Sequence, residues 1–391
     1  MTNKIYYLTR SYAPYQKGGG PLMRTGAVKY LQELGWDVTV VMPNYDSKEL
    51  IIEQNIIQIP FKGKHIQKLA SLFERVGIYE DYLDKWVKDA YEYLENKIKK
   101  EDIIFATSGG ELGMINLGSL LKDKISCKFV INFRDPLDYS IVNRLKLDNK
   151  FHVSREKQEY KYLKNSDLII TSSKTNQNSL VSKYPEWKYK IVNNYFGYIK
   201  KLDINKFKKK VSDKLRIAYV GNMGDLQKPE ILYEIYKKSN LENLEIFFIG
   251  NTKSYKPLQN IVDDNVKFID FLPHEEFLKF MIENIDIGFV SLTSDYLGAC
   301  VPSKIYEYIN LGLPMIGALP DGDGKDIINK NGYGMACNYN DSNNLIDALK
   351  RFQDKVFLEN VRNSILDNRD KWFMKNRIKE VNVFLREFDE N

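Results

Sequence analysis

Short apolar runs alternate with amphipathic stretches along almost the whole chain, separated by turns rich in glycine, proline or polar residues. The runs have the length of strands and lack the strict alternation of a half-exposed sheet, which is typical of parallel strands buried on both faces. The sequence therefore predicts an α/β protein with parallel sheets. Strands are predicted at residues 4–9, 38–42, 56–59, 102–106, 128–133, 168–171, 189–192, 215–220, 244–249, 266–269, 286–290 and 314–318.

Amphipathic stretches between these runs predict the helices. The first is expected from Pro21 to Gly35, with an apolar face of Leu22, Val28, Leu31 and Leu34. Others are expected after residue 110, from residue 229, and at residues 65–100, 154–164, 174–183, 274–283 and 303–311, with one or two terminal helices over 355–388.

The alternation is interrupted over residues 193–213, where lysines are frequent and periodicity is weak. We therefore predict two Rossmann-like, doubly wound domains that face each other across a cleft. The predicted limits are 1–195 for the N-terminal domain, 196–213 for a linker, 214–355 for the C-terminal domain, and 356–391 for terminal helices that cross back to the N-terminal domain.

Composition adds limits to this picture. The chain has 391 residues, of which 43% are hydrophobic, enough for the cores of two or three domains. Its net charge of +6 favours an anionic substrate or membrane surface and is too small to indicate nucleic acid. Three cysteines and three histidines are widely spaced, so neither a disulfide nor a metal site is predicted and a reducing compartment is expected.

The N-terminal residues run directly into the first strand without a charged and then apolar leader. Because no apolar stretch approaches the ~18 residues of a membrane-spanning helix, we predict a cytoplasmic protein. Residues 61–75 combine apolar side chains with the basic residues Lys62, Lys64, Lys68 and Arg75. Peripheral contact with the inner face of the cell membrane is one interpretation of this segment, and a solvated amphipathic helix is the other.

Three loops share one design, in which an apolar strand is followed by a glycine or serine turn and then by a helix start. A helix start offers unpaired N–H groups and a partial positive charge, so it favours an anion. Ser303 is expected to be the N-cap of the helix over 303–311. The loops predict a phosphorylated ligand shared by both domains, whereas the alternative is a set of ordinary capped helices. The candidate ligand-binding residues are Gly19, Gly20, Gly221, Asn222, Gly224, Gln227, Lys228, Ser303, Lys304 and Glu307.

Neither of two common nucleotide-binding motifs is present. The glycines after the first strand do not form G-x-G-x-x-G, and Gly221 to Gly224 gives only G-x-x-G. No G-x-x-x-x-G-K-[ST] occurs either. The sequence therefore does not favour a dinucleotide dehydrogenase or a P-loop enzyme.

The segment GACVPSKIYEYINLGLPMIG, at residues 298–317, resembles the donor site of GT-B glycosyltransferases. It is similar to a bacterial branch of glycosyltransferase family 4 that has P-S-K-x-Y-E-Y where other members have E-x7-E. Residues 9–14, 106–108, 133–136 and 219–224 resemble other loops of that branch, so the resemblance spans roughly residues 4 to 350. It implies transfer of a sugar from a nucleotide diphosphate sugar, most simply a UDP-sugar, without a bound metal or other cofactor and with retention. The implied acceptor is a glycan or lipid-linked glycan of a bacterial surface polysaccharide.

The resemblance also implies roles for individual residues. Glu307 occupies the position of the second glutamate, which accepts hydrogen bonds from ribose hydroxyls, and Ser303 and Lys304 lie where the diphosphate binds. Asn222 and Lys228 match an arginine and a lysine that neutralise the leaving phosphate. The chain departs from the family pattern at the first glutamate, where it has Ala299, and Asp295 is a candidate replacement.

Other polar residues are candidates for the acceptor side. Arg134 and Asp135 follow a predicted strand, where they would act as a catalytic or acceptor-binding pair or, alternatively, fix the loop as an internal ion pair. Glu111 is a further candidate in the preceding loop. His274 begins a helix near the expected base pocket, although a capping or surface role is the simpler interpretation.

Two other functions fit a similar fold. A sugar-nucleotide epimerase would need acid and base carboxylates and would use no acceptor. A non-catalytic nucleotide-sugar binding protein would explain Ala299 in place of the first glutamate.

Overall fold

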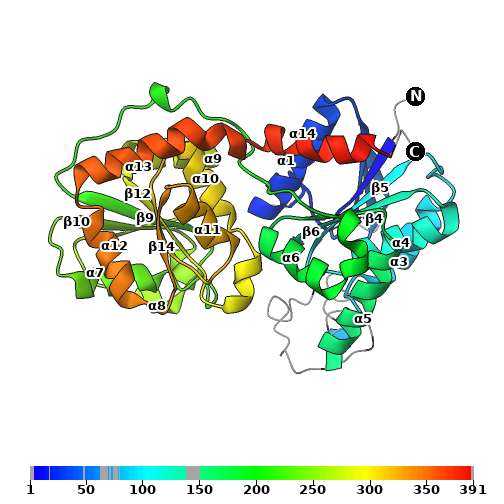
Figure 1. Ribbon diagram of the computed structural model, residues 1–391, viewed down its shortest axis with the longest axis horizontal. Helices are drawn as coiled ribbons and strands as arrows, with labels where there is room; N and C mark the ends of the chain where they lie inside the picture. The colour runs from blue at the N-terminus through cyan, green and yellow to red at the C-terminus, as the bar shows by residue number, and fades with distance from the viewer. Residues whose placement is uncertain are drawn as a thin grey trace. The chain divides into compact units, whose positions relative to one another are not determined.

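The apolar runs of the sequence become the strands of two separate sheets in the computed structural model (Figure 1). The structure describes residues 4–16, 18–46, 49–61, 69, 72–73, 78, 80–137 and 150–388. The chain divides into two compact units: unit 1 comprises Met1–Phe196 and Arg377–Asn391, and unit 2 comprises Gly197–Asn376. Residues 197–213 therefore belong to unit 2, where Lys209 pairs with Asp286 at 3.0 Å.

Unit 1 contains an eight-stranded sheet in the order β3-β4-β2-β1-β5-β6-β7-β8. Its strands are β1 (Lys4–Leu8), β2 (Asp37–Asn44), β3 (Ile51–Glu53), β4 (Ile56–Pro60), β5 (Ile103–Gly109), β6 (Lys128–Asp135), β7 (Leu168–Thr171) and β8 (Ile191–Asn193). All neighbours pair in parallel except β3 and β4, which form an antiparallel edge. The helices described in this unit include α1 (Gly19–Glu33), α3 (Asp84–Leu94), α4 (Gly113–Ile125), α5 (Lys150–Asn165) and α6 (Lys174–Lys183).

Unit 2 contains a six-stranded parallel sheet in the order β11-β10-β9-β12-β13-β14. Its strands are β9 (Leu215–Gly221), β10 (Leu244–Gly250), β11 (Val266–Ile269), β12 (Ile287–Ser291), β13 (Met315–Ala318) and β14 (Gly334–Cys337). Its helices are α7 (Glu230–Ser239), α8 (Lys256–Gln259), α9 (His274–Asn284), α10 (Ser303–Leu311), α11 (Asp323–Lys330), α12 (Ser342–Arg351) and α13 (Lys355–Asn368).

In each sheet, the strands that come later in the chain are added first on one side of the first strand and then on its other side. We call the place between the first strand and the strand added on that other side the switch point of the sheet. In unit 1 it lies between β1 and β5, and in unit 2 between β9 and β12. The helices that follow the two strands of such a pair cover opposite faces of the sheet, so their loops diverge and leave a crevice at the carboxyl ends of the strands. The switch points are therefore where ligand-binding residues are expected.

The chain returns to unit 1 through its last helix, α14 (Met374–Arg386). Within unit 1, Trp36 Nε1 donates to Asn382 Oδ1 at 2.8 Å, and the Arg386 guanidinium lies 4.2 Å from the centre of the Trp36 ring. Asn194 Nδ2 donates to the Arg377 carbonyl oxygen and to Glu380 Oε2, both at 3.0 Å. These contacts attach α14 to the ends of α1 and β8.

Some expectations about the elements were wrong. The helices α11 and α12 and the strand β14 were not predicted, whereas the terminal region 355–388 forms two α-helices as expected, α13 and α14, with a short 3-10 helix (Arg369–Trp372) between them. Leu22 is 45% exposed, because the buried side of α1 is formed by its neighbours Met23, Ala27, Val28 and Leu31. Of the helix predicted over 65–100, residues 84–94 form α3, the chain after it turns before residue 100, and residues 65–68, 70–71, 74–77 and 79 lie outside the described residues.

Tight packing of α10 on the sheet positions the switch point of unit 2. The ring of the buried Tyr308 lies against Gly288 on β12, and a Cβ atom at Gly288 would be 2.5 Å from it. The Tyr308 hydroxyl donates to the carbonyl oxygens of Ala218 at 3.3 Å and Phe289 at 3.2 Å. Residue 288 has to be glycine for α10 to lie this close to β9 and β12.

We predict that Gly288→Ala lowers the free energy of unfolding by roughly 1–3 kcal/mol, because the added methyl group overpacks the contact with Tyr308. Tyr308→Phe keeps the ring and loses the hydroxyl bonds, so it should cost only about 1 kcal/mol. Urea unfolding of the three proteins measures both effects. A Gly288→Ala protein as stable as the parent would contradict the packing argument.

Candidate functional site

The strand β9 ends in a glycine, so its carboxyl end carries no side chain of its own. Gly221 ends the strand with φ +100°, a conformation that glycine tolerates and other residues rarely adopt. A Cβ atom at Gly250, on the neighbouring strand β10, would lie 2.2 Å from the Gly221 carbonyl oxygen. A Cβ atom at Gly221 would lie 3.3 Å from Cε of Lys304. The backbone at this edge of the sheet can therefore approach a ligand closely, with Lys304 beside it.

The loop between β9 and α7 is held by hydrogen bonds from several elements. Tyr219 donates its hydroxyl to the Asn222 carbonyl oxygen at 2.7 Å, and the backbone N–H groups of Gln227 and Lys228 both donate to the Gly224 carbonyl oxygen at 2.9 Å. The Ser291 hydroxyl, at the end of β12, donates to the Gln227 carbonyl oxygen. Asn222 and Lys228 are exposed and Gln227 is half-buried, so the loop presents polar side chains from a fixed backbone.

The start of α10 differs from the expectation for Ser303. The helix begins at Ser303 itself, which is exposed, and Pro302 is the N-cap residue. In the described chain, no side chain caps this helix start. The N-cap prediction for Ser303 was therefore wrong, because proline preorganises the backbone before a helix without offering a side-chain acceptor. The Ile305 N–H donates to the Pro302 carbonyl oxygen at 3.0 Å, so the N–H groups of Ser303 and Lys304 are the ones left for an anion in the described structure.

Lys304 is only partly exposed and lacks a counter-charge. Its ammonium nitrogen lies 3.6 Å from the centre of the Tyr219 ring. Among the residues that the structure describes, it has neither a hydrogen bond nor an ion pair. Burial lowers the pKa of Lys304 well below its usual value, since desolvation disfavours the charged form. An anion beside this side chain would restore the charged form.

Glu307 lies one turn further along the same helix and is also incompletely paired. Its Oε1 atom is buried and lacks a hydrogen-bond partner within the described part of the chain. Burial raises the pKa of Glu307 to about 7, partly offset by a hydrogen bond with Asn310. Residues three apart on a helix share a face. α10 therefore presents an unpaired ammonium and an unpaired carboxyl oxygen together.

The position of the missing first glutamate is occupied by a short 3-10 helix, Asp295–Ala299. Asp295 is exposed and accepts a hydrogen bond from the Tyr339 hydroxyl at 3.2 Å. His274, the first residue of α9, is exposed and stacks on Phe277 with ring centres 6.4 Å apart. These contacts give His274 an ordinary surface position.

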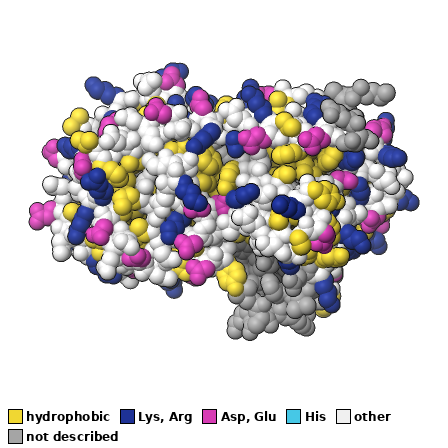
Figure 2. Space-filling model, viewed as in Figure 1, with side chains coloured by type: hydrophobic (Ala, Val, Ile, Leu, Met, Phe, Trp, Pro, Cys, Tyr) yellow, Lys and Arg dark blue, Asp and Glu magenta, His cyan; other side chains and the backbone are white. Residues whose placement is uncertain are grey.

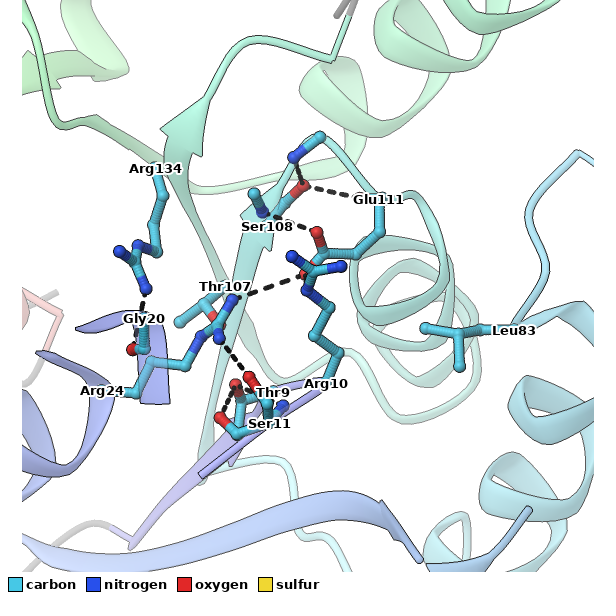
Figure 3. A network of polar contacts seen from close by, with 12 residues as sticks. Thr9, Arg10, Ser11, Gly20, Arg24, Leu83, Thr107, Ser108, Glu111 and Arg134 are labelled. Atoms are coloured by element: carbon cyan, nitrogen blue, oxygen red, sulfur yellow. Dashed lines mark hydrogen bonds and ion pairs between the residues drawn. The ribbon is translucent and has the colours of Figure 1, made fainter. Parts of the chain in front are cut away.

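The switch point of unit 1 carries a second polar site (Figure 3). Gly19 and Gly20 begin α1, and Arg134 Nη1 donates to the Gly20 carbonyl oxygen at 2.9 Å. The Arg134 guanidinium also lies 5.0 Å from the centre of the Phe196 ring. Asp135 is half-buried at the end of β6, with its Oδ2 atom beside Gly109. Arg134 is thus oriented toward the loop before α1 and not toward its neighbour Asp135.

Glu111 is the centre of this second site. It is 4% exposed, accepts a hydrogen bond from the Gly109 N–H at 2.8 Å on Oε2, and lies near two arginines. Arg10 Nε is 3.4 Å and Arg24 Nη2 is 3.7 Å from Glu111 Oε1. We call Arg10, Arg24 and Arg134 the arginine cluster.

Sequence reasoning missed Arg10 and Arg24. Arg24 had a detectable signal, because it stands four residues before Val28 and seven before Leu31, on the buried stripe of α1. A charged residue on such a stripe is almost never fully buried unless it is paired. Arg10 follows β1 directly, but the sequence did not indicate which carboxylate it would meet.

The structure brings the predicted residues together in two groups. In unit 2, Lys304 contacts Gly221, Ser303 and Glu307 share α10, and Asn222, Gly224, Gln227 and Lys228 form the adjacent loop. In unit 1, Gly19 and Gly20 lie at the start of α1 next to Arg134, while Asp135 lies near Glu111. A single pyrophosphate shared by Gly19, Gly221 and Ser303 stays a prediction.

Surface charge and membrane contact were also predicted from the sequence. Figure 2 shows Lys and Arg side chains interspersed with Asp and Glu over the viewed face of each unit. Within the described ranges, no helix has both the length and the apolar character of a membrane span. The basic residues proposed for membrane contact, Lys62, Lys64, Lys68 and Arg75, lie outside the described residues. Across the described positions, no group of three or more His, Cys, Asp or Glu side chains is placed to hold a metal ion.

Comparison with known proteins identifies solved structures with a similar fold. No protein-family model matches the chain, and no curated protein matches it. Among solved structures, it is similar to the apo form of the lipopolysaccharide outer core galactosyltransferase WaaB, with a TM-score of 0.69 and 13% identity over 98% of this chain and 99% of that one. It is also similar to Anabaena Alr3699/HepE in complex with UDP-glucose, with a TM-score of 0.66 and 14% identity over 98% and 99% of the two chains.

A third similar structure is α,α-trehalose 6-phosphate synthase from Burkholderia multivorans, with a TM-score of 0.71 and 10% identity over 100% of this chain and 98% of that one. The chain has the GT-B fold. The prediction of two Rossmann-like domains with parallel sheets is therefore confirmed. At these identities the likeness shows the fold alone, so activity has to be argued from the site.

The raised pKa of Glu307 predicts a pH effect on stability. Between pH 4.5 and about 7 the folded protein keeps a proton that the unfolded chain loses, so this residue makes stability fall as pH rises through that window. In Glu307→Gln, the decrease in the free energy of unfolding over this pH range should be smaller by roughly 1–2 kcal/mol. Denaturant unfolding at pH 4.5, 6 and 7.5 measures the difference, with the exposed Glu276→Gln as the charge control. Parallel curves for the parent and Glu307→Gln would contradict the burial of this carboxyl group.

Proposed function

We propose that the chain is a glycosyltransferase that takes a sugar from a nucleotide diphosphate sugar, most simply a UDP-sugar, bound at the switch point of unit 2. The observation that carries the proposal is that two side chains on α10 have polar atoms without partners. Lys304 has no counter-charge and Glu307 Oε1 has no donor within the described residues. A diphosphate supplies the charge and a ribose supplies hydroxyl donors, so one nucleotide would satisfy both.

The surrounding backbone suits the diphosphate. The uncapped start of α10 offers N–H groups, the backbone of Gly221 lies close by without a side chain, and Lys304 stands beside both. As the bond to the sugar breaks, negative charge grows on the departing diphosphate, and donors already in place stabilise it there. Lys228, exposed on the adjacent loop, would add a second positive charge at this step.

The similar structures support the same substrate class. WaaB is a galactosyltransferase by description, and the HepE structure contains UDP-glucose. The P-S-K-x-Y-E-Y segment supports the bacterial branch of glycosyltransferase family 4, and with it retention at the anomeric carbon and catalysis without a metal or other cofactor. We propose a hexosyl or N-acetylhexosaminyl donor, with a glycan or lipid-linked glycan of a bacterial surface polysaccharide as the acceptor. The enzyme would act in the cytoplasm, at or near the inner face of the membrane.

The acceptor side is assigned to unit 1. Arg134 and Asp135 end β6, the strand next to the switch pair, where a carboxylate and a guanidinium would orient an acceptor hydroxyl. Gly19 and Gly20, at the start of α1, would contribute N–H groups to a phosphate group bound in unit 1. These roles follow from position at the carboxyl ends of the strands.

A non-catalytic nucleotide-sugar binding protein is the second candidate. The observation that favours it is Ala299, which puts a methyl group where the resembled family has a carboxylate for the donor sugar. The two candidates share nucleotide binding and differ in turnover.

We predict acceptor-dependent release of UDP when the protein is incubated with UDP-sugars and a lipid-linked or free glycan, and a loss of at least about tenfold in this activity with Glu307→Ala. Coupled detection of UDP measures the rate. Nucleotide binding without release would support the binding protein, and conversion of the sugar without an acceptor would support an epimerase. Undiminished turnover by Glu307→Ala would refute the role of Glu307.

Lys304→Met is predicted to separate stability from binding. It removes a desolvated ammonium without a counter-charge, so the free protein should melt at a higher temperature, while the affinity for UDP should fall about tenfold or more. Lys237→Met, which removes an exposed lysine of α7 paired with Asp263, is the matched control and should leave UDP affinity unchanged. Thermal unfolding and calorimetry give both quantities. Equal UDP affinity in the parent and Lys304→Met would place the phosphates elsewhere.

A further inference from the structure

The arginine cluster of unit 1 converges from three different segments. Arg10 follows β1 and Arg24 comes from α1, both at the switch point between β1 and β5, and Arg134 lies at the end of the next strand, β6 (Figure 3). The side chain of Arg24 is 4% exposed, whereas that of Arg10 is 39% exposed. The cluster therefore reaches from the interior of unit 1 to its surface.

Positive charge exceeds negative charge at this place. Glu111 is the carboxylate that pairs with Arg10 and Arg24, and both Glu111 and Asp135 approach Gly109. Glu111 directs its short hydrogen bond to the Gly109 N–H, while its contacts with Arg10 and Arg24 are 3.4 Å and 3.7 Å long. Within the described residues, Glu111 Oε1 accepts no hydrogen bond. The arginines are thus only partly neutralised.

The guanidinium groups also retain unused donors. Arg24 Nε and Arg134 Nε are buried and have no hydrogen-bond partner in the described structure. Leaving a buried charged donor unpaired costs more than about 1–3 kcal/mol, so native proteins rarely keep such groups without a ligand or water. Burial, together with the neighbouring Arg134, lowers the pKa of Arg24 to about 10.

Both groups approach the same glycine. A Cβ atom at Gly20 would lie 3.4 Å from Arg134 Nη1 and 3.7 Å from Arg24 Nη1. Gly20 belongs to the start of α1, a 15-residue helix whose N-terminus has no side-chain cap in the described chain. Gly18 and Gly19 are exposed beside it. The helix start therefore adds partial positive charge and N–H donors on the accessible side of the cluster.

We propose that the arginine cluster and the start of α1 bind a phosphate group carried by the acceptor substrate. Forked guanidinium donors with added backbone N–H groups match a tetrahedral oxyanion with two charges better than a neutral sugar. The inference rests on the proposed function, because it assigns the ligand of unit 1 to the acceptor. It narrows the acceptor to a phosphorylated sugar or a phosphate-linked glycan.

Calorimetry on the full chain tests this with glucose 6-phosphate, inorganic phosphate and, as the neutral control, glucose. Glucose 6-phosphate should bind and glucose should not, in the absence and in the presence of saturating UDP. Arg134→Met should weaken glucose 6-phosphate binding about tenfold or more, and Arg134→Lys should restore part of it. Lys29→Met, which removes an exposed charge from the same helix, should bind like the parent.

Three outcomes would overturn the inference: glucose binding as tightly as its phosphate, unchanged binding by Arg134→Met, or displacement of glucose 6-phosphate by UDP, which would assign the cluster to the donor diphosphate. If Arg134→Met fails to fold by circular dichroism, Arg10→Met provides the same test at a more exposed position. UDP affinity measured in the same samples reports separately on unit 2. If the protein does not bind UDP, the proposed function fails, while Arg134-dependent binding of the phosphate probe would still support the anion site.

Discussion

An ammonium group held partly out of water without a counter-charge determines the character of the site in unit 2. Among the described residues, the ammonium nitrogen of Lys304 has only the face of the Tyr219 ring as a partner, at 3.6 Å, and desolvation lowers its pKa. Its position is imposed by α10, which lies close to the sheet because residue 288 is glycine. The free energy of folding therefore holds Lys304 in a place without a counter-charge, and a bound anion can supply that charge. This is the arrangement expected where donors are oriented before a charged ligand arrives.

The two switch points follow the same rule with different chemistry. In unit 2 an ammonium and a carboxyl group lie one turn apart on one helix, whereas in unit 1 Arg10 and Arg24 come from different segments to Glu111 and Arg134 contacts the start of α1. Both sites keep buried polar atoms without partners in the described residues, namely Glu307 Oε1, Arg24 Nε and Arg134 Nε. Such atoms are uncommon in folded proteins. At the carboxyl ends of the strands these atoms lie beside charged groups, and this combination is the physical reason for regarding both places as binding sites.

Much of the fold was predictable because buried parallel strands leave continuous apolar runs that periodicity detects. β14 was missed, since Gly334–Cys337 is short and only its Ala336 is buried. The site was predictable where a local pattern carries it, as with Lys304 and Glu307 on α10. The unpaired state of these residues could not be predicted, because it depends on what the sheet places nearby. The role expected of Ser303 as N-cap failed for a local reason, namely that Pro302 already fixes the helix start.

The attachment of α14 has a consequence for the biosynthesis of the protein. The side chains of Trp36 and Asn194, which belong to the first half of the chain, contact Asn382, Arg386, Arg377 and Glu380 of α14. Domains generally fold as units while the ribosome still elongates the chain. Unit 1 is therefore incomplete until all of unit 2 has been translated, and until then α14 does not cover the Trp36 ring. The nascent N-terminal half has to remain soluble through that interval, and the last helix completes it when it emerges.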